Sequence, residues 1–406
     1  MRILYISQYF PPEIGAPSAR VHEFARYWSE MGHEVKVLTA FPNHPTGVIP
    51  EEYRGEIFRR EFVDGIEVLR TWVFAAPNRG FAKRIMNYVS FPASAVLLGI
   101  PKIGSCDVVI ATSPQFFVAV AGYIISRFKK KPFIFEVRDL WPDSIKAVGA
   151  MSDGFVLQVL TSIEEFLYRR ASKIIAVANS TKGILSRRGV PEFKICIIPN
   201  GADINLFRPG PKNNKIRERY GIDADDFVVS YIGTHGMAHG LKTVLDAASH
   251  LKNNGRIRFL FVGEGAEKEK LIKLAKDYAL SNVMFIDQQP KELIPYFYQA
   301  SDVCLVPLLD RQLFSAVLPS KIFEIMSCGR PIVLSVRGES RALIERASAG
   351  IAIEPENPDQ MIEAVLSLYA NAQLAEFFGS NGRKFVENYY SREKMAEDYI
   401  QVLLSG

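Results

Sequence analysis

Short apolar runs alternate along the chain with longer stretches in which apolar residues recur every three or four positions. In the first half, the short runs are rich in β-branched residues and read RILYISQ, EVKVLTA, GIEVLRTWV, DVVIATS, PFIFEVRD and KIIAVAN. Stretches such as SARVHEFARYWSEMG, between them, have the spacing of amphipathic helices. Strands that alternate with helices in this way predict a parallel sheet covered by helices on both faces.

The second half repeats this pattern, with the runs FVVSYIG, IRFLFVGEG, VMFIDQ, DVCLVPL, PIVLSV and GIAIEP. Proline, glycine, asparagine and aspartate cluster between the two rounds, at residues 199–210. A chain of 406 residues is also long for a single core. We therefore predict an α/β protein with two doubly wound, Rossmann-like parallel-sheet domains that face a cleft, and ligands bound there at the carboxyl ends of the strands. The expected domains are 1–205 and 206–388, with a helix in 389–406 that packs back on the first domain.

Composition excludes a disordered chain, because 48% of the residues are apolar and 23% are charged. The four cysteines are scattered through apolar runs without a Cys-x-x-Cys motif, which predicts reduced, buried thiols. The N-terminal run MRILYISQYF predicts a strand and not a signal peptide. The apolar segment 108–126 is interrupted by Thr-Ser-Pro-Gln and predicts a strand, a turn and a helix, not a membrane span. We expect a cytoplasmic protein.

The net charge of +5 is distributed unevenly. Residues 1–205 carry 25 Lys and Arg against 19 Asp and Glu, whereas residues 206–406 carry 24 against 25. A basic first half predicts an anionic partner, which leaves nucleic acid, a phosphorylated substrate and anionic lipid open. The six histidines form no cluster with metal-ligand spacing, and Asp-Ala-Asp at 223–225 precedes a strand instead of ending one. We therefore expect no metal site.

Two glycine turns follow predicted strands. Gly15, in YFPPEIGAPSAR, would let the backbone approach a ligand ahead of a helix capped by Ser18, although a flexible loop explains it equally well. Gly263 and Gly265, in FVGEGAEKEKL, precede a helix, where free backbone N–H groups suit an anion or the edge of a base. The alternative is a plain strand-to-helix turn. Neither turn has the Gly-x-Gly-x-x-Gly spacing of a dinucleotide site.

The segment PSKIFEIMSCGRPIV, residues 319–333, places Lys321 and Glu324 one turn apart on a short predicted helix. A capping box after Ser320 would need an acid at 323, where the chain has Phe323, so capping does not explain Glu324. An ion pair between Lys321 and Glu324 is the alternative, and it would contribute only about 0.2–0.5 kcal/mol. We interpret Lys321 as a phosphate-binding charge and Glu324 as an acceptor for ribose hydroxyls, which together would bind a nucleoside diphosphate.

The second-half segments FVVSYIG, FVGEGAEKEKL, VMFIDQ, DVCLVPL, PSKIFEIMSCGRPIV and GIAIEP follow one another in an order and spacing that resemble the donor domain of retaining glycosyltransferases of family 4. These enzymes have the GT-B fold. The first half resembles the acceptor domain of the same family. Its segments PPEIGAPSARVHEFARYWSEMGHEVKVLTAFPNHPTG and EVRDLWPDS are similar to a bacterial subgroup that acts in O-antigen and capsule synthesis and includes N-acetyl-fucosamine transferases. The resemblance covers nearly the whole chain. It implies an N-terminal acceptor-side domain, 1–205, and a C-terminal nucleotide-sugar donor domain, 206–388.

The resemblance implies transfer, with retention, of a sugar from a nucleotide-diphosphate donor to a polyprenyl-diphosphate-linked saccharide. The donor would be UDP-linked, for instance an N-acetylated hexosamine, and the reaction would need no metal, cofactor or nucleic acid. Lys321 would stabilise the leaving diphosphate together with helix N–H groups and Arg330. Arg138 and Asp139, where many members have His-Asp, would contact donor sugar or acceptor.

The resemblance also implies a set of donor-binding residues, several of which act through their backbone. They are Gly15, Gly233, Gly263, Glu264, Gly265, Ile286, Gln288, Ser315, Val317, Leu318, Ser320 and Glu324. The chain departs from the family at several positions, among them Ala16, which replaces the second glycine of the family's loop after the first strand. The first of two family glutamates corresponds to Ala316, and the family's Arg and Lys after the first donor-domain strand are replaced within GTHGMAHG, where His239 lies near the lysine position.

Two other functions share this fold. A nucleotide-sugar 2-epimerase would need several acid–base side chains in the cleft, and the sequence indicates no such cluster. A non-catalytic nucleotide- or lipid-binding relative is favoured by the missing glutamate at Ala316.

Segment 78–102 combines basic residues with apolar positions at helical spacing, including Phe81, Ile85, Tyr88 and Val89. Its basic residues are Arg79, Lys83, Arg84 and Lys102. A core helix with solvated lysines is one interpretation. The other is a helix that lies on anionic lipid, which predicts peripheral binding at the inner face of the cytoplasmic membrane.

Overall fold

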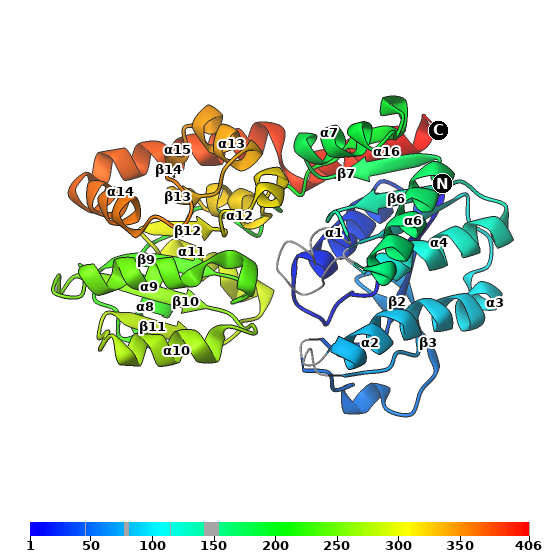
Figure 1. Ribbon diagram of the computed structural model, residues 1–406, viewed down its shortest axis with the longest axis horizontal. Coiled ribbons are helices and arrows are strands. Elements are labelled where there is room, and N and C mark those ends of the chain that lie inside the picture. The colour runs from blue at the N-terminus through cyan, green and yellow to red at the C-terminus, as the bar shows by residue number, and fades with distance from the viewer. Residues whose placement is uncertain (45, 77–80, 114, 142–153, 406) are drawn as a thin grey trace. The chain divides into compact units, whose positions relative to one another are not determined.

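The computed structural model describes the chain except for residues 45, 77–80, 114, 142–153 and 406. It consists of two compact units (Figure 1). One unit comprises Met1–Pro199 together with Arg392–Gly406, and the other comprises Asn200–Ser391. The chain therefore first changes unit at the start of the segment 199–210, where turn-forming residues cluster.

The first unit is built on an eight-stranded sheet with the order β3-β4-β2-β1-β5-β6-β7-β8. Its strands are β1 (Arg2–Ile6), β2 (Glu34–Ala40), β3 (Phe58–Val63), β4 (Ile66–Thr71), β5 (Val108–Thr112), β6 (Phe133–Val137), β7 (Lys173–Ala176) and β8 (Ile195–Ile197). All neighbours pair in parallel except β3 and β4, which pair antiparallel. The apolar runs predicted the other six strands. They did not predict β3, which lies at the edge with polar FRREFV, or β8, which has three residues.

Helices α1 (Ala16–Glu30) and α16 (Arg392–Leu404) pack together in the first unit and share a core cluster with one face of the sheet. The indole N–H of Trp28 donates to the backbone oxygen of Ala396 at 3.0 Å, and Glu23 pairs with Arg392 at 2.5 Å. The helix α1 begins at Ala16 with Gly15 as its N-cap, so the prediction that Ser18 caps it is wrong. Ser18 lies within the first turn, and its buried hydroxyl has no hydrogen-bond partner.

The helices α4 and α6 of the first unit also pack against the sheet. The Cβ of an alanine in place of Gly122, on α4, would lie 2.5 Å from Cβ of Ala111 on β5, so the helix approaches the strand closely. The helical segments are α2 (Phe81–Ser94), η2 (Ala95–Gly99), α3 (Ile100–Ile103), α4 (Phe116–Lys129), α6 (Phe155–Arg170) and α7 (Asn179–Arg187), with single turns η1 (Glu51–Tyr53) and η3 (Glu192–Lys194).

The second unit has a six-stranded sheet with the order β11-β10-β9-β12-β13-β14, and every neighbouring pair is parallel. Its strands are β9 (Phe227–Ile232), β10 (Ile257–Val262), β11 (Val283–Ile286), β12 (Val303–Pro307), β13 (Ile332–Ser335) and β14 (Gly350–Ala352). All six were predicted by the apolar runs. The α/β class and the two mostly parallel sheets are therefore confirmed, and the cleft between the domains stays a prediction.

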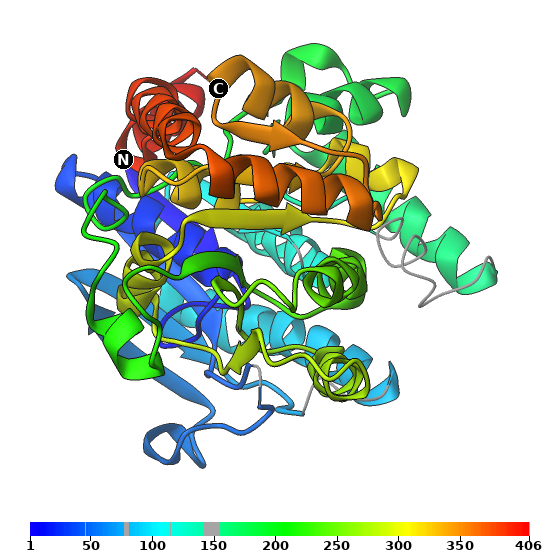
Figure 2. The same ribbon diagram turned by 90° about the vertical axis from the view of Figure 1, so that its left-hand side faces the viewer.

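Helices cover the second sheet (Figure 2). The helices α9, α10 and α14 contribute to one apolar cluster with strands β9, β10 and β12. The helices are α8 (Lys215–Tyr220), α9 (Leu241–His250), α10 (Lys268–Asp277), α11 (Ile294–Ala300), α12 (Lys321–Ser327), α13 (Glu339–Ala347), α14 (Pro358–Ala370) and α15 (Ala372–Tyr389). Short 3-10 turns are η4 (Met237–His239), η5 (Lys291–Leu293) and η6 (Gln312–Ala316). The four cysteines of the chain are free, and Cys196 alone is only half-buried.

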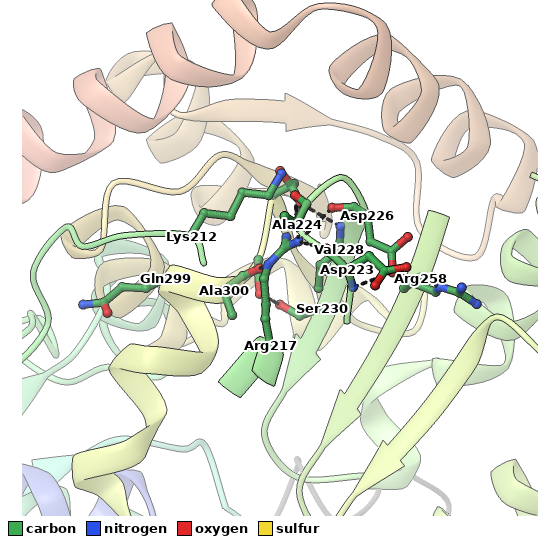
Figure 3. Close-up of polar contacts among 12 residues, drawn as sticks. Lys212, Arg217, Asp223, Ala224, Asp226, Val228, Ser230, Arg258, Gln299 and Ala300 are labelled. Atoms are coloured by element: carbon green, nitrogen blue, oxygen red, sulfur yellow. Dashed lines mark hydrogen bonds and ion pairs between the residues drawn. The ribbon is translucent and has the colours of Figure 1, made fainter. Parts of the chain in front are cut away.

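A polar network stabilises the amino ends of the strands in the second unit (Figure 3). The buried guanidinium of Arg217 donates to backbone oxygens of Ala300, Asp223 and Asp226 at 2.8–3.0 Å and pairs with Asp302 at 2.9 Å. Asp226 accepts from Arg258 at 3.3 Å. These carboxylates therefore serve the fold at the edge opposite the strand carboxyl ends, and in the described chain no group of three or more His, Cys, Asp or Glu could hold a metal ion.

Replacing Arg217 with methionine is expected to lower the free energy of unfolding by about 1–3 kcal/mol, because three backbone oxygens lose their donor, whereas Asp302 keeps its ion pair with Lys212. Chemical denaturation measures the change. Arg256→Met is a suitable control, since Arg256 pairs with Asp225 in an exposed setting, where the ion pair contributes about 1 kcal/mol or less. Equal losses in the two variants would contradict this assignment.

Candidate functional site

Backbone contacts join the loops that follow β9 and β10. The N–H of His235 donates to the oxygen of Glu264 at 2.8 Å, and that of Gly263 donates to Ile286 at 2.9 Å. A Cβ at Gly263 would lie 2.0 Å from the oxygen of Gly233, and one at Gly265 would lie 2.4 Å from the oxygen of His235. Only glycine permits this approach, so the predicted residues from these loops lie along one edge of the sheet.

Lys321, at the start of α12, reaches these loops with its ammonium group. A Cβ added at Gly233 would lie 2.6 Å from Nζ, which also lies 4.0 Å from the ring centroid of Tyr231. Within the described residues, this buried nitrogen has no hydrogen-bond partner. Burial lowers the pKa of Lys321 to about 7, although the charge of Glu324 acts in the opposite direction. Because an unpaired buried ammonium is costly, an oxyanion beside it would be stabilised strongly.

Two histidines lie close to Lys321 around Tyr231. His235 is fully buried, and in the part of the chain that the structure describes neither of its ring nitrogens has a hydrogen-bond partner. His239 contacts the edge of Tyr231 with 5.9 Å between ring centroids, and its Nδ1 lies 3.2 Å from the oxygen of Gly236. Burial, with the charge of nearby lysines, lowers the pKa of His235 to about 4 and that of His239 to about 3. Both rings are neutral at pH 7, so Lys321 supplies the local positive charge.

Sequence reasoning missed His235. Its signal was a polar residue three positions after a buried strand, but the surrounding glycines did not indicate a regular element, and the histidine was considered only as a metal ligand. Burial of the ring follows from the backbone contact of Gly265 with His235, which brings the β10 loop over it.

Glu324 lies on α12, one turn after Lys321, and is half-buried. The hydroxyl of Tyr298 donates to its Oε2 at 3.3 Å. The ion pair of Lys321 with Glu324 that their spacing would allow is not formed, because Nζ of Lys321 has no bonded partner. The spacing therefore places both side chains on one helix without neutralising the lysine.

The loop before α12 contains the predicted residues Ser315, Val317, Leu318 and Ser320. Leu318 is buried and the other three are half-buried. The hydroxyl of Ser340 donates to the oxygen of Val317 at 2.7 Å, and a Cβ at Gly338 would lie 2.1 Å from the oxygen of Ser315. The start of α13 therefore fixes the loop, and Ser320 makes no side-chain cap.

The remaining charged residues of the predicted donor site have partners. Glu264 and Asp287 both accept from Nζ of Lys268 at 2.5 Å. The backbone of Glu264 and the half-buried side chain of Gln288 therefore remain as candidate contacts to a ligand. Arg330 donates to the backbone oxygens of Gly210 and Gln299, at 3.1 and 2.6 Å. Its contacts are those of a residue that positions the chain around α12.

In the first unit, Gly15 is exposed and has a φ of 145°. The loop before it is held by Glu13, a buried carboxylate that the sequence did not single out. One Glu13 oxygen accepts from the N–H groups of Asn43 and His44, both at 2.9 Å. Burial raises the pKa of Glu13 to about 7, partly offset by these N–H groups. Glu13 therefore ties the Gly15 loop to the segment after β2.

Arg138 and Asp139 directly follow β6 in the first unit. The hydroxyl of Ser113 accepts from both of their backbone N–H groups, at 2.7 and 3.3 Å. Asp139 is exposed, whereas Nε and Nη1 of Arg138 are buried without hydrogen-bond partners. The structure thus places Arg138 and Asp139 at the carboxyl edge of the sheet, and among the described residues no hydrogen bond reaches Nε or Nη1 of the arginine.

The predicted membrane segment is described in part, because residues 78–80 and the side chains of Phe81 and Arg84 lie outside the described residues. On α2, Lys83, Ile85, Met86 and Val89 are exposed, and Tyr88 is half-buried. On η2, Leu97 is 74% exposed. The exposed apolar positions do not fit a helix buried in the core. Within the described ranges, a helix with the length and apolar character of a transmembrane span is absent.

Comparison with known proteins adds family information to this geometry. Residues 212–385 match the family model of glycosyl transferases group 1, and residues 15–201 match that of the glycosyl transferase 4-like domain. WcaI of Escherichia coli K12, a putative colanic acid biosynthesis glycosyl transferase, is 24% identical over 409 residues, which cover 98% of this chain and 99% of the relative. An uncharacterized glycosyltransferase of Methanocaldococcus jannaschii, MJ1069, is 21% identical over 99% of this chain and 98% of its own.

Solved structures show the same fold. Alr3699/HepE of Anabaena, in complex with UDP-glucose, matches with a TM-score of 0.76 and 18% identity over 100% of both chains. A sucrose-phosphate synthase from Thermosynechococcus elongatus gives the same TM-score, identity and coverage. Both similarities concern the GT-B architecture of two α/β domains.

Proposed function

The chain is a glycosyltransferase of group 1, the GT4 type, and we propose that it transfers a sugar from a UDP-linked donor to a lipid-linked saccharide during surface polysaccharide synthesis. The observation that carries the donor part is the unpartnered, buried ammonium of Lys321 beside the glycine loops of β9 and β10. A diphosphate would give this charge its missing partner. Negative charge grows on the leaving diphosphate in the transition state, so Lys321 would also promote the reaction.

Glu324 and the backbone of the nearby loops complete the proposed donor site. The Glu324 carboxylate, oriented by Tyr298, would accept hydrogen bonds from the ribose hydroxyls. The base would lie near Glu264, Ile286 and Gln288, and the loop from Ser315 to Ser320 would contact sugar and phosphates through its backbone. The missing glutamate at Ala316 removes one carboxylate from the sugar side, and the fixed loop backbone supplies the remaining polar groups.

The donor sugar and acceptor follow from relatives and are proposed only. WcaI is named for colanic acid synthesis and Alr3699/HepE binds UDP-glucose, which favours a UDP-hexose and a surface polysaccharide. We propose an N-acetylated hexosamine, transferred with retention to a polyprenyl-diphosphate-linked acceptor. Arg138 and Asp139 would then contact the acceptor side of the reaction.

A donor screen tests this function. Purified protein is incubated with individual UDP-sugars, with and without a polyprenyl-diphosphate saccharide, and the products are identified by mass spectrometry. Sugar transfer that depends on the acceptor is expected. Acceptor-independent epimerised nucleotide sugar would instead show a 2-epimerase, and tight UDP binding without any turnover would show a binding protein.

Glu324→Ala should weaken UDP binding, and unchanged affinity would contradict the ribose assignment.

Transfer is expected to proceed at its full rate in excess chelator, because Lys321 is positioned to offset the diphosphate charge itself. The measurement compares turnover in EDTA with turnover in added magnesium. Activity that disappears with chelator and returns with magnesium would show that this charge is not sufficient.

Peripheral binding to anionic vesicles is expected, because Lys83 lies beside the exposed apolar residues Ile85, Met86, Val89 and Leu97. Each basic residue near such a surface contributes about 1 kcal/mol, which salt screens. Charge reversal of the basic residues Arg79, Lys83 and Arg84 should reduce co-flotation. Reversal of Lys270, Lys273 and Lys276, in the α10 region of the other unit, is the matched control. Flotation that salt does not weaken, or equal losses in both variants, would refute the assignment.

A further inference from the structure

A buried group of charges lies in the first unit, centred on Glu136 of β6. The Glu136 side chain is completely buried. One oxygen accepts from Thr112 at 2.7 Å and from Tyr5 at 3.0 Å, and Arg20 donates to both oxygens at 3.1 and 3.3 Å. Burial opposes ionisation here, but the charge of Arg20, followed by that of Arg138 and by the hydrogen bonds, holds the pKa of Glu136 below its usual value. Glu136 is therefore a fully bonded carboxylate.

Arg20, on α1, is the partner that neutralises this carboxylate. The remainder of its guanidinium donates to the backbone oxygens of Pro199 and Ile198, at 2.8 and 2.9 Å. Arg20 and Glu136 thus form a closed, mutually neutral pair whose hydrogen-bonding groups are used within the unit. The contacts of Arg20 and Glu136 therefore stabilise the first unit and need no ligand.

Arg138, two residues after Glu136, adds a second positive charge, which the carboxylates of Glu136 and Asp139 offset only in part. Its Nε and Nη1 are buried and have no hydrogen-bond partner. The adjoining Asp139 is exposed, and Ser113 accepts only from the backbone of the two residues. Burial and the charge of Arg20 lower the pKa of Arg138 to about 10, so the guanidinium remains charged at pH 7. A charge that is offset only in part and that lacks hydrogen bonds at two buried nitrogens destabilises the ligand-free protein.

We propose that Arg138 binds a phosphate or diphosphate group of the acceptor substrate. The identity of the acceptor as a phosphate-linked saccharide rests on the proposed function. The site lies at the carboxyl end of β6, where doubly wound sheets bind ligands. A guanidinium matches a phosphate with two parallel N–H donors, which an ammonium cannot do. In the proposed function, Lys321 of the other unit binds the donor diphosphate. The charge on Arg138 is then available to bind the acceptor phosphate.

The test compares Arg138→Met with Arg20→Met, two replacements of neighbouring buried arginines by an uncharged side chain. Inorganic pyrophosphate is the probe, titrated calorimetrically into each protein, and thermal unfolding is measured in parallel without ligand. Arg138→Met should weaken pyrophosphate binding at least tenfold, the lower end for a hydrogen bond to a charged group, and leave the melting temperature unchanged or higher. Arg20→Met should lower the melting temperature, because it leaves Glu136 uncompensated. Loss of stability in Arg138→Met with unchanged pyrophosphate affinity would overturn the proposal.

Two further arms separate donor from acceptor. In Lys321→Met, pyrophosphate binding that depends on Arg138 should persist, and in wild type it should persist when UDP saturates the donor site. Complete competition by UDP would assign Arg138 to the donor diphosphate and refute the acceptor assignment. Failure of UDP to bind at all would count against the proposed function, while the pyrophosphate comparison of Arg138→Met with Lys321→Met would still decide the role of Arg138.

Discussion

Lys321→Met is expected to lower the turnover number by roughly 10²–10³-fold, the range measured when one donor to a developing oxyanion is removed. Donor affinity should fall as well, because the diphosphate loses its charged partner. The ligand-free protein should be no less stable than wild type, because Nζ of Lys321 makes no hydrogen bond. Steady-state kinetics with the donor found by screening, together with thermal unfolding, measures these effects.

Lys268→Met is the matched control for this experiment. Lys268 lies in the same region, but its charge is already paired with Glu264 and Asp287. Its loss should reduce stability and have a much smaller effect on turnover. If both variants lose activity and stability in parallel, the effect of Lys321 is structural and the diphosphate assignment is wrong.

The depressed pKa of Lys321 adds a pH dependence to the same prediction. Since its pKa is about 7 in the folded chain against an ordinary 10.5, the ammonium loses its proton as the pH rises through about 7. The diphosphate of a UDP-sugar keeps its charge over this range, so donor affinity should fall with rising pH, and Lys321→Arg should flatten the profile. The unfolded chain binds this proton up to 10.5, so the lysine's unfavourable contribution to stability is full below pH 7 and fades above it.

Gly263→Ala is expected to lower the free energy of unfolding by roughly 3 kcal/mol or more and to abolish donor binding. The residue has a φ of 143°, and its Cβ would lie 2.0 Å from a backbone oxygen of Gly233, which cannot rotate away. Strained backbone alone costs about 1–3 kcal/mol, and the clash adds to it. Separation of the β9 and β10 loops would also displace Gly233 from Lys321. Chemical denaturation and UDP calorimetry measure the two effects.

Two glycines of the same unit separate strain from collision. Gly221→Ala introduces a side chain at a φ of 62° into open space and should cost only about 1 kcal/mol. Gly255→Ala meets neither a positive φ nor a neighbour within 4 Å and should be close to neutral. If Gly263→Ala behaved like Gly221→Ala and still bound UDP, the close approach of the two loops would not be what builds the site.

Local patterns were sufficient for most of the fold because each strand of a parallel sheet is buried on both faces and therefore reads as a continuous apolar run. This identified β9 to β14 and most of the first sheet. It failed for β3, an edge strand with FRREFV that needs only one apolar face, and for β8, whose three residues give no pattern. Ser18 was misassigned as a cap because the chain enters α1 three residues earlier, with Gly15 as the N-cap.

The sequence by itself determined the two α/β rounds, the cluster of turn-forming residues between them at 199–210, and the position of Lys321 and Glu324 one turn apart on one short helix. These features depend on residues that are neighbours in the chain. Only the tertiary structure decided that, among the described residues, Nζ of Lys321 has no hydrogen-bond partner, that His235 is buried beside it, and that Arg20 makes the ion pair with Glu136. These properties depend on burial and on contacts between residues far apart in sequence, such as Gly233 with Lys321, and desolvation then determines which charge is left for a ligand.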